Sequence, residues 1–402
     1  MKNTRKILYI FIVLISSCTP VKNSINASSS PRNKPSPPSL KLKSETPEAY
    51  IKEAKLIAVG DIMMHGAQIK SGYDPQKKTY SYQGFFTEVK NTLSRGDWVM
   101  GNLETTLAGA DLGGYTGYPM FNAPAELLDA IKAGGFNILT TANNHSLDRG
   151  AQGVIRTIKN IRDRGLHSTG TFPSEAEANK ILIVNKNNIA MAILAYSYGT
   201  NGIPFPPGKN YLVNIIDEQK IIKDIAKAKK QGADVITICL HFGAEYQRQP
   251  NPQQKKLVEN LIKAGADIIL GSHPHVVQPY QTFQVPEKNG KSRTAVAIYS
   301  MGNFISNQTR KYTDIGVIFQ VNIRKKFPDK TIEITKVDAF PTWVNRYPDN
   351  NKLNFRVLPI AEVLAQKKDP ILPNSQYPVL DKYLQEMNTH LTSLKKTDRG
   401  NP

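Results

Sequence analysis

The segment Ala264-Gly-Ala-Asp-Ile-Ile-Leu-Gly-Ser-His-Pro-His275 decides the fold of this 402-residue chain. Gly265 can end a helix, and the short apolar run Ile268–Leu270 is typical of a buried strand. The polar loop that follows carries two histidines. We therefore expect a helix, then a buried parallel strand, then a loop that delivers imidazoles to a site.

Two earlier segments repeat this order of glycine, apolar run and histidine. Gly134-Gly135 leads to the loop Asn143-Asn144-His145, and Gly232-Ala233 leads through Val235–Cys239 to His241. Four of the seven histidines in the chain lie in these three loops. The pattern predicts three αβ units whose strands end in histidine.

Two carboxylates follow earlier strands in the same way. The apolar run Leu56–Val59 predicts the first strand, with Asp61 at its end, and a second such run is followed by Glu104. Acidic residues at strand ends are common in α/β sites. The segments 109–121 and 197–211, which contain several glycines and tyrosines, are predicted to be loops over the site.

The alternation of strands and helices changes after His275. Strand-like runs then follow one another without helices, which predicts a second, more antiparallel sheet. We expect one domain over residues 49–345 and a C-terminal extension over 346–402, in which Leu380–Leu391 predicts one amphipathic helix packed on the domain. The strand-like runs are Val276–Val285, Ala295–Ser300, Gly316–Ile323 and Ile332–Val337.

The N-terminus has the pattern of an export signal. Three basic residues precede an apolar run over Ile7–Ile15 that is too short to span a membrane, which predicts a signal peptide over residues 1–17. The order Leu14-Ile15-Ser16-Ser17-Cys18 resembles the bacterial lipobox, which implies lipidation of Cys18 and anchoring at the extracytoplasmic face of the bacterial cell membrane. An ordinary signal peptide that contains a cysteine is the alternative. Residues 18–48, rich in Ser, Pro, Asn and Lys, predict a disordered tether.

The composition fits an exported globular protein with an anionic partner. The net charge is +19, or about +16 without residues 1–17. This excess predicts an anionic surface or polymer as partner, with a solvated basic surface as the alternative. Nucleic acid is not an expected partner, because the export signal removes the chain from the cytoplasm. Cys239 has no disulfide partner if Cys18 is lipidated, and we expect it in the core.

The polar side chains at the strand ends together form a set of metal ligands. Carboxylates, imidazoles and an amide oxygen suit two divalent transition metals such as Mn, Fe, Zn or Co, and the lack of thiolates argues against a structural zinc site. A carboxylate that bridges two ions about 3.5–4 Å apart is typical of hydrolytic dimetal centres. Each of these residues alone is more often a turn residue, so only the whole set indicates a site. The set is Asp61, His65, Glu104, Asn144, His145, His241, His273 and His275.

Six motifs, in order from about Leu56 to Phe304, resemble those of one protein family. They are Gly60-Asp61-Ile-Met, Asn102-Leu103-Glu104, Ala142-Asn143-Asn144-His145, His241-Phe-Gly with Glu245-Tyr246, Gly271-Ser-His273-Pro-His275 and Ser300-Met-Gly-Asn303-Phe304. Together they are similar to the capsule biosynthesis CapA family, also called the PgsA or poly-gamma-glutamate synthesis family. The resemblance implies a relation to the calcineurin-like metallophosphoesterases. It therefore implies an α/β fold, a four-layer αββα sandwich with two mixed sheets and a dimetal centre formed by the strand-end loops.

The resemblance also implies a role for each site residue. Asp61 with His65 would bind one metal, Glu104 would bridge, and Asn144 with His241 would bind the other metal. His273 and His275 would complete the two coordination spheres. His145 would contact the scissile group and protonate the leaving oxygen as a general acid. The residues expected to support the ligands or contact the substrate are Asn102, Asn143, Glu245 and Asn303.

Three motifs depart from those of the metallophosphoesterases. Asp61 and His65 lie four positions apart, where those enzymes usually have Asp-x-His. The bridging position is Glu104 in place of the usual Asp, and Asn143-Asn144-His145-Ser146 replaces a Gly-Asn-His sequence followed by an acid. These differences favour metal binding over ordinary phosphatase activity.

Two functions remain open on the sequence. The first is a membrane-anchored, metal-dependent hydrolase that acts on a phosphoester, or on an amide or ester in an anionic polymer. The second is a non-catalytic assembly protein that binds poly-gamma-glutamate or a similar capsule polymer and works with other capsule synthesis proteins. The basic charge of the mature chain fits an acidic polymer.

Overall fold

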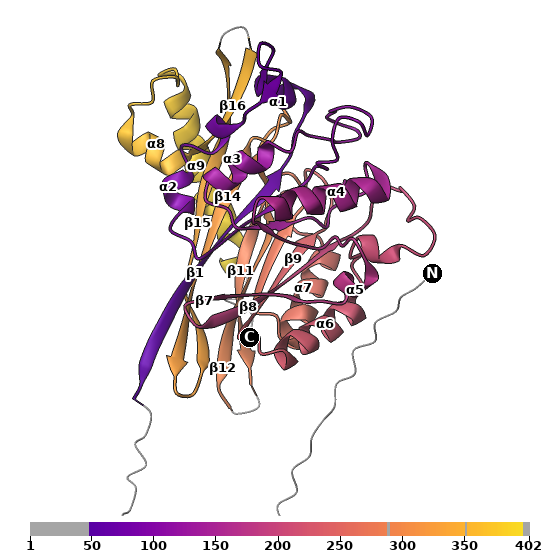
Figure 1. Cartoon of the computed structure of the whole chain (residues 1–402). Helices are drawn as coiled ribbons and strands as arrows, with labels where there is room; N and C mark the ends of the chain where they lie inside the picture. The colour runs from indigo at the N-terminus through magenta and orange to yellow at the C-terminus, as the bar shows by residue number, and fades with distance from the viewer. Residues whose placement is uncertain (1–47, 288–289, 350–351, 397–402) are drawn as a thin grey trace, which may run out of the picture. The chain divides into compact units, whose positions relative to one another are not determined.

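The computed structural model describes residues 48–287, 290–349 and 352–396 (Figure 1). The predicted signal peptide, the lipidation site Cys18 and nearly all of the predicted tether lie outside the described residues. Among the residues described, no helix is both long enough and apolar enough to cross a membrane.

Two mixed β-sheets form the centre of the fold. The first has the order β16-β15-β14-β1-β4-β5-β6, with β13 paired to β1, and the second has the order β11-β12-β10-β9-β8-β7. The first sheet contains β1 (Tyr50–Ile62), β4 (Trp98–Leu103), β5 (Ile138–Thr140), β6 (His167–Thr169), β13 (Asn303–Ile305), β14 (Ile315–Phe327), β15 (Thr331–Asp349) and β16 (Lys352–Pro359). The second contains β7 (Leu182–Lys186), β8 (Ile189–Ser197), β9 (Val235–His241), β10 (Ile268–Ser272), β11 (Val277–Pro286) and β12 (Ser292–Met301).

The helices are mostly short and lie on the outside of the sheets (Figure 1). They are α1 (Gly66–Ser71), α2 (Lys90–Leu93), α3 (Leu127–Ala133), α4 (Gly150–Asp163), α5 (Glu175–Ala178), α6 (Glu218–Lys230), α7 (Pro252–Ala264), α8 (Ile360–Gln366) and α9 (Gln376–Leu391). The small hairpin β2 (Tyr73–Asp74) and β3 (Thr79–Tyr80) and the 3₁₀ turns Gln83–Phe85, Asn210–Leu212 and Ser393–Lys396 complete the described elements.

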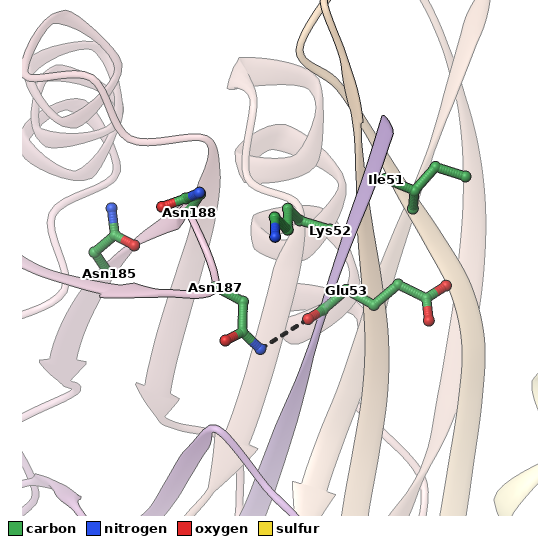
Figure 2. Close-up of a pocket in the computed structure, with 6 residues that line it drawn as sticks. All are labelled: Ile51, Lys52, Glu53, Asn185, Asn187 and Asn188. Carbon is green, nitrogen blue, oxygen red and sulfur yellow. Dashed lines mark hydrogen bonds between the residues drawn. The ribbon is translucent and has the colours of Figure 1, made fainter. Parts of the chain in front are cut away.

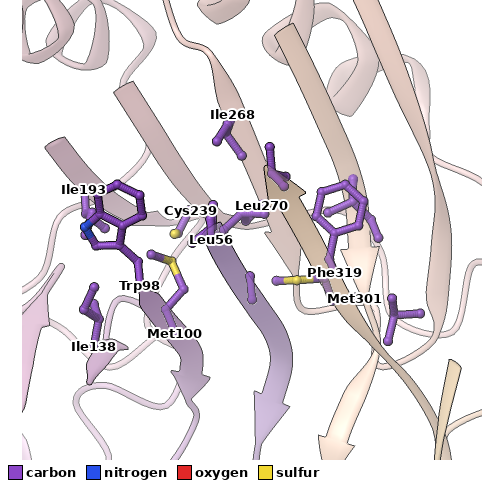
Figure 3. Close-up of a cluster of buried hydrophobic side chains, with 14 of the residues drawn as sticks. Leu56, Trp98, Met100, Ile138, Ile193, Cys239, Ile268, Leu270, Met301 and Phe319 are labelled. Carbon is purple, nitrogen blue, oxygen red and sulfur yellow. The ribbon is translucent and has the colours of Figure 1, made fainter. Parts of the chain in front are cut away.

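A core of apolar side chains from both sheets lies between them. Leu56 and Trp98 of the first sheet meet Ile193 and Ile268 of the second in this cluster, as Figure 3 shows. Side chains alternate between the faces of a strand, so the next residue, Ile57, faces the opposite side and packs with the outer helices. The indole N–H of Trp98 donates to a backbone carbonyl of β7 at 3.1 Å, which satisfies its one polar group across the sheets.

The outer faces of the two sheets are covered by different helices. The cluster outside the first sheet includes residues of α2 and α3, and the cluster outside the second includes residues of α6 and α7. The order of layers is therefore helix, sheet, sheet, helix, and the four-layer αββα prediction is confirmed. Helix α9 packs against both β11 and β15, one strand from each sheet.

Helix α7 and strand β10 confirm the interpretation of the opening segment. Asn251 caps α7 and accepts a hydrogen bond from the backbone of Gln254 at 2.8 Å, with Pro252 at the first helical position. Gly265 ends the helix with φ 115°, a left-handed conformation that favours glycine. The buried strand Ile268–Ser272 then pairs in parallel with β9 and β12.

The prediction of a separate antiparallel sheet after His275 is wrong. Strands β11 and β12 join the second sheet, whereas β14, β15 and β16 extend the first. Each sheet therefore combines parallel and antiparallel pairs, and the strands after His275 are divided between the two sheets. The local sequence could not show this, because strand partners are chosen by packing over long separations in the chain.

The expected boundary at residue 345 is also wrong. It falls inside β15, and the region beyond it supplies the edge strand β16 and the helix α8 in addition to the predicted α9. Strand β16 pairs with β15 over eight residue pairs from Thr342 to Asp349. The C-terminal region is therefore an integral part of the first sheet.

The β7–β8 hairpin joins the two sheets at the start of β1. Its turn residues Asn187 and Asn188 have φ 52° and 61°, values that asparagine tolerates in tight hairpin turns. The Asn187 amide donates to the carbonyl oxygen of Glu53 at 2.9 Å, as Figure 2 shows. A shallow pocket at this place is lined by Lys52 and neighbouring residues, and it lies at the opposite end of β1 from Asp61.

Candidate metal centre

The carboxyl ends of parallel strands from both sheets meet in one buried cluster. Asp61 lies near the end of β1 and Glu104 follows β4 in the first sheet, and His241 ends β9 and His273 follows β10 in the second. A side chain at Gly60 would place its Cβ only 1.8 Å from the carbonyl oxygen of Gly302. Glycine at position 60 thus lets β13 approach β1, which puts Asp61 beside Asn303 in the parallel pairing.

Asp61, Glu104 and His241 form the first candidate ligand group. One donor atom from each lies within 4.8 Å of the others, and all three residues are buried. Glu104 lies between two imidazoles, with Oε1 3.5 Å from Nε2 of His241 and 3.8 Å from Nε2 of His275. This central position is the one expected of a bridging carboxylate.

The carboxylate of Glu104 has no hydrogen-bond partner among the described residues. Both of its oxygens are buried and unpartnered, which is costly for an ionised group. Burial, followed by the charge of Asp61, raises the pKa of Glu104 well above its usual range. Cations at this position would supply the missing partner and keep Glu104 ionised.

His241 is oriented by contacts on both ring nitrogens. Its Nδ1 lies 3.0 Å from the Ser272 hydroxyl and 3.2 Å from the Asn102 amide, and its Nε2 lies 2.8 Å from Oδ1 of Asn144. Burial, followed by the nearby His273, lowers the pKa of His241 well below its usual value. The ring is therefore neutral at physiological pH, the form that binds a metal.

The second candidate ligand group is His273, His275 and the exposed Glu245, whose donor atoms also lie within 4.8 Å of one another. His273 and His275 have φ 98° and 57°, a left-handed backbone that non-glycine residues rarely adopt and that concentrates at functional sites. Nδ1 of His273 is buried without a hydrogen-bond partner in the described part of the chain. Burial, then His275, lowers the pKa of His273 to about 4.

Two of the asparagines predicted to support the ligands, Asn102 and Asn303, contact proposed ligands, and the third, Asn143, contacts the strand before Glu104. The Asn102 amide donates to Oδ1 of Asp61 at 2.8 Å. Oδ1 of Asn303 lies 3.0 Å from Nδ1 of His275, which also lies 3.2 Å from Oδ2 of Asp61. Asn143 donates to the backbone oxygen of Leu103 at 2.8 Å and so holds its loop against β4.

His145 lies beside this cluster and pairs with an acid that the sequence analysis missed. Its Nδ1 is 2.7 Å from Oδ2 of Asp148, and both side chains are buried. Because a carboxylate only accepts, Nδ1 carries the proton and Nε2 is the nitrogen free for chemistry. Nε2 is 3.5 Å from the Asn201 amide, and the ring of Phe121 packs edge-on at 4.6 Å.

The geometry places His65 differently from the other predicted ligands. It caps α1, with its backbone N–H donating to the Gln68 side chain at 2.9 Å, and its Nδ1 accepts the backbone N–H of Asn307 at 3.3 Å. It belongs to neither candidate ligand group. Its four-residue separation from Asp61 lets β1 end and a helix begin between them, so its ring is used as a cap.

Four residues of the site were not predicted individually. Asp148 holds His145, Ser272 contacts His241, and Asn201 accepts a hydrogen bond from Asn144 through its Oδ1 at 3.0 Å. The ring of Tyr198 lies 4.5 Å from that of His273. Tyr198 and Asn201 belong to the predicted site loop 197–211, whereas Asp148 could have been found as the nearest acid after His145.

The donor set fits two divalent transition metals. Buried carboxylates, neutral imidazoles and the Asn144 amide oxygen surround the unpartnered Glu104, and they are ligands of borderline ions such as Mn, Fe, Zn or Co. Cys239 lies in the core between the sheets and adds no thiolate to the site, as expected.

The chain is similar in sequence to known capsule synthesis proteins. A family model described as bacterial capsule synthesis protein PGA_cap matches residues 55–308. The capsule biosynthesis protein CapA of Bacillus anthracis is 31% identical over 276 residues, which cover 66% of this chain and 63% of that protein. The PGA biosynthesis protein CapA of Bacillus subtilis (strain 168) is 30% identical over 302 residues, covering 74% of this chain and 75% of that protein.

Among solved structures, a calcineurin-like phosphoesterase from Bacillus subtilis is similar at 16% identity with a TM-score of 0.43, covering 73% of this chain and 91% of that one. The family match extends over the strands that carry Asp61, Glu104, Asn144, His241, His273, His275 and Asn303. The chain belongs to the family of bacterial capsule synthesis proteins described as PGA_cap.

Proposed function

We propose that this protein acts in the synthesis or export of an anionic capsule polymer such as poly-gamma-glutamate, and that its metal centre hydrolyses a bond in that polymer. The single observation that carries the proposal is the unpartnered carboxylate of Glu104, buried between His241 and His275. The relatives named for capsule and PGA biosynthesis support the polymer context.

The proposed assignment of ligands follows the distances. Asp61, Glu104, Asn144, His241, His273 and His275 would hold two divalent metals, with Glu104 between them. When bound, such ions supply an activated water and a positive charge that stabilises developing negative charge. His65 is left out of the assignment, because it belongs to neither candidate ligand group.

His145 would move a proton at the leaving atom. Its Nδ1 proton is held by Asp148, so Nε2 is the nitrogen that can deliver a second proton. The contact with Asp148 also fixes the plane and the tautomer of the ring. The edge-on contact with Phe121 limits rotation of the ring from the other side.

The proposal is tested by turnover of defined substrates. Purified protein loaded with Mn²⁺ is expected to shorten poly-gamma-glutamate, measured by chromatography and by release of new amino groups, and a chelator is expected to stop the reaction. If the protein turns over phosphoesters but not the polymer, its function would be that of a phosphoesterase. Tight polymer binding with no metal-dependent cleavage would instead support the non-catalytic assembly function.

We also propose that the protein is exported and anchored through Cys18, on the strength of the lipobox-like sequence Leu14–Cys18. Multiple acyl chains on one residue give firm membrane attachment. Cys18→Ser is expected to abolish labelling by a radioactive fatty acid and to leave the precursor unprocessed. Normal processing and unchanged membrane association of this variant would contradict the anchor.

A further inference from the structure

Two crossed arginine–tyrosine contacts lie beside the metal centre. The guanidinium of Arg310 lies over the ring of Tyr246 at 4.3 Å, and that of Arg248 lies over the ring of Tyr312 at 4.0 Å. The ammonium of Lys311 lies 4.8 Å from the same Tyr312 ring. The loop that contains Tyr246 and Arg248 thus supplies a cation to the ring of Tyr312. The loop that contains Arg310, Lys311 and Tyr312 supplies a cation to the ring of Tyr246 in return.

Both loops are attached directly to the ligands of the site. The backbone N–H of Tyr246 donates to the oxygen of Pro274 at 2.7 Å, and its ring lies 6.3 Å from that of His275. Asn303, which contacts His275 through Oδ1, uses its amide group to hold the other loop, donating to Thr313 O at 2.9 Å and to the Gln308 side chain at 3.0 Å. The loops that carry the cations are therefore fixed to the segment that contains His275.

Tyr246 and Tyr312, whose rings contact the cations, both have a left-handed backbone conformation. Tyr246 has φ 65° and Tyr312 has φ 69°, a strained conformation that bulky residues rarely adopt. Such strain persists only where surrounding contacts impose it. The Tyr312 hydroxyl donates to Glu386 of α9 at 3.0 Å, which fixes that ring in place.

The three cations form no ion pair with any acidic residue in the part of the chain that the structure describes. Arg310 and Lys311 are exposed and form no ion pair there, and Nε of Arg248 is buried without a hydrogen-bond partner. In contrast, surface arginines elsewhere, such as Arg162 and Arg324, pair with glutamates. The contacts with the rings orient the guanidinium groups but do not neutralise them.

We propose that Arg310, Lys311 and Arg248 form a cationic track that binds successive carboxylates of the polymer and leads it to the metal centre. The inference rests on the proposed function and names the part of the chain that recognises its substrate. A planar guanidinium matches a carboxylate with two parallel hydrogen bonds, and several separate cations fit a chain with repeated negative charges. A single small anion would engage only one of them.

Binding of poly-gamma-glutamate to the whole protein tests the track without requiring turnover. Arg310→Gln is expected to weaken the affinity about tenfold, the size of one lost charge-assisted hydrogen bond. Lys311→Gln is expected to weaken it severalfold, and both effects are expected to shrink at high salt. The matched control is Lys52→Gln, which removes the same charge from the far end of β1 (Figure 2) and is expected to leave the affinity unchanged.

The outcomes separate this inference from the proposed function. Cleavage of polymer by the wild type, with equal binding by wild type, Arg310→Gln and Lys311→Gln, would overturn the track alone. A wild type that binds no polymer would overturn both. If Arg310→Gln and Lys52→Gln lose equal polymer affinity, the effect is one of general charge and the track is wrong. If the protein binds polyphosphate more tightly than polyglutamate at equal charge, the assignment of carboxylates as the bound groups is wrong.

Discussion

Glu104→Gln stabilises the metal-free protein and removes the stabilisation that Mn²⁺ gives to the wild type. The variant replaces a buried carboxylate that has no partner among the described residues by a neutral amide of the same shape. An unsatisfied buried group of this kind costs about 1–3 kcal/mol, which the substitution should recover in part. Metal at 100 times its Kd should stabilise the wild type by about 2.7 kcal/mol and the variant by much less.

The pH dependence of stability gives the same prediction a second readout. Burial raises the folded-state pKa of Glu104 above its unfolded value, so the folded state binds more protons between these two values. The contribution of Glu104 to the stability of the metal-free protein should therefore fall as the pH rises above about 4.5, so the stability that Glu104→Gln gains over the wild type should grow with pH. Denaturant unfolding across pH, with and without Mn²⁺, measures both effects.

Exposed Glu259 of α7 provides the matched control for this prediction. Glu259→Gln makes the same chemical change in water and should alter neither the metal-free stability nor the response to Mn²⁺. If Glu104→Gln destabilises the metal-free protein, or if it gains as much from Mn²⁺ as the wild type does, the bridging position of Glu104 is wrong.

His145→Ala reduces turnover by about 10²- to 10⁴-fold while leaving the metal content and the polymer affinity unchanged. This is the usual contribution of a positioned acid or base to the rate. His145 belongs to neither candidate ligand group, so its removal should not release metal. The measurement is kcat on the polymer, together with metal analysis of the same sample.

Asp148→Asn tests how His145 is held. An amide can donate to Nδ1 of His145, which favours the wrong ring tautomer, so kcat should fall with little change in KM and the pH profile should shift. Loss of metal from either variant would show that the two residues support the ligands and do not transfer a proton. Full activity of His145→Ala would remove the general acid from the mechanism.

The sequence was sufficient for the local elements that carry the site. Gly265 after an apolar helix face, and Ile268–Leu270 after Gly265, are signals within one segment, and α7 and β10 follow them closely. Asp61, Glu104 and His241 could be grouped because each is a potential metal ligand at the carboxyl end of a predicted strand. The family motifs added Asn303, which no local pattern singles out.

Other features depend on contacts between distant parts of the chain. The division of β11 to β16 between two sheets is decided by packing in the core, which the alternation of strands does not encode. His65 could not be distinguished from a ligand, because its role as a helix cap depends on Asn307 and Gln68. Arg310 and Arg248 lie in unremarkable polar segments, and only the fold brings them to Tyr246 and Tyr312.

Metal analysis of the purified wild-type protein tests the dimetal centre most directly. After reconstitution with Mn²⁺ or Fe²⁺ and removal of free ions, we expect close to two bound metals per chain, with a large drop in His241→Ala and His273→Ala and no drop in His65→Ala. A wild-type protein that retains no transition metal under these conditions would contradict the account.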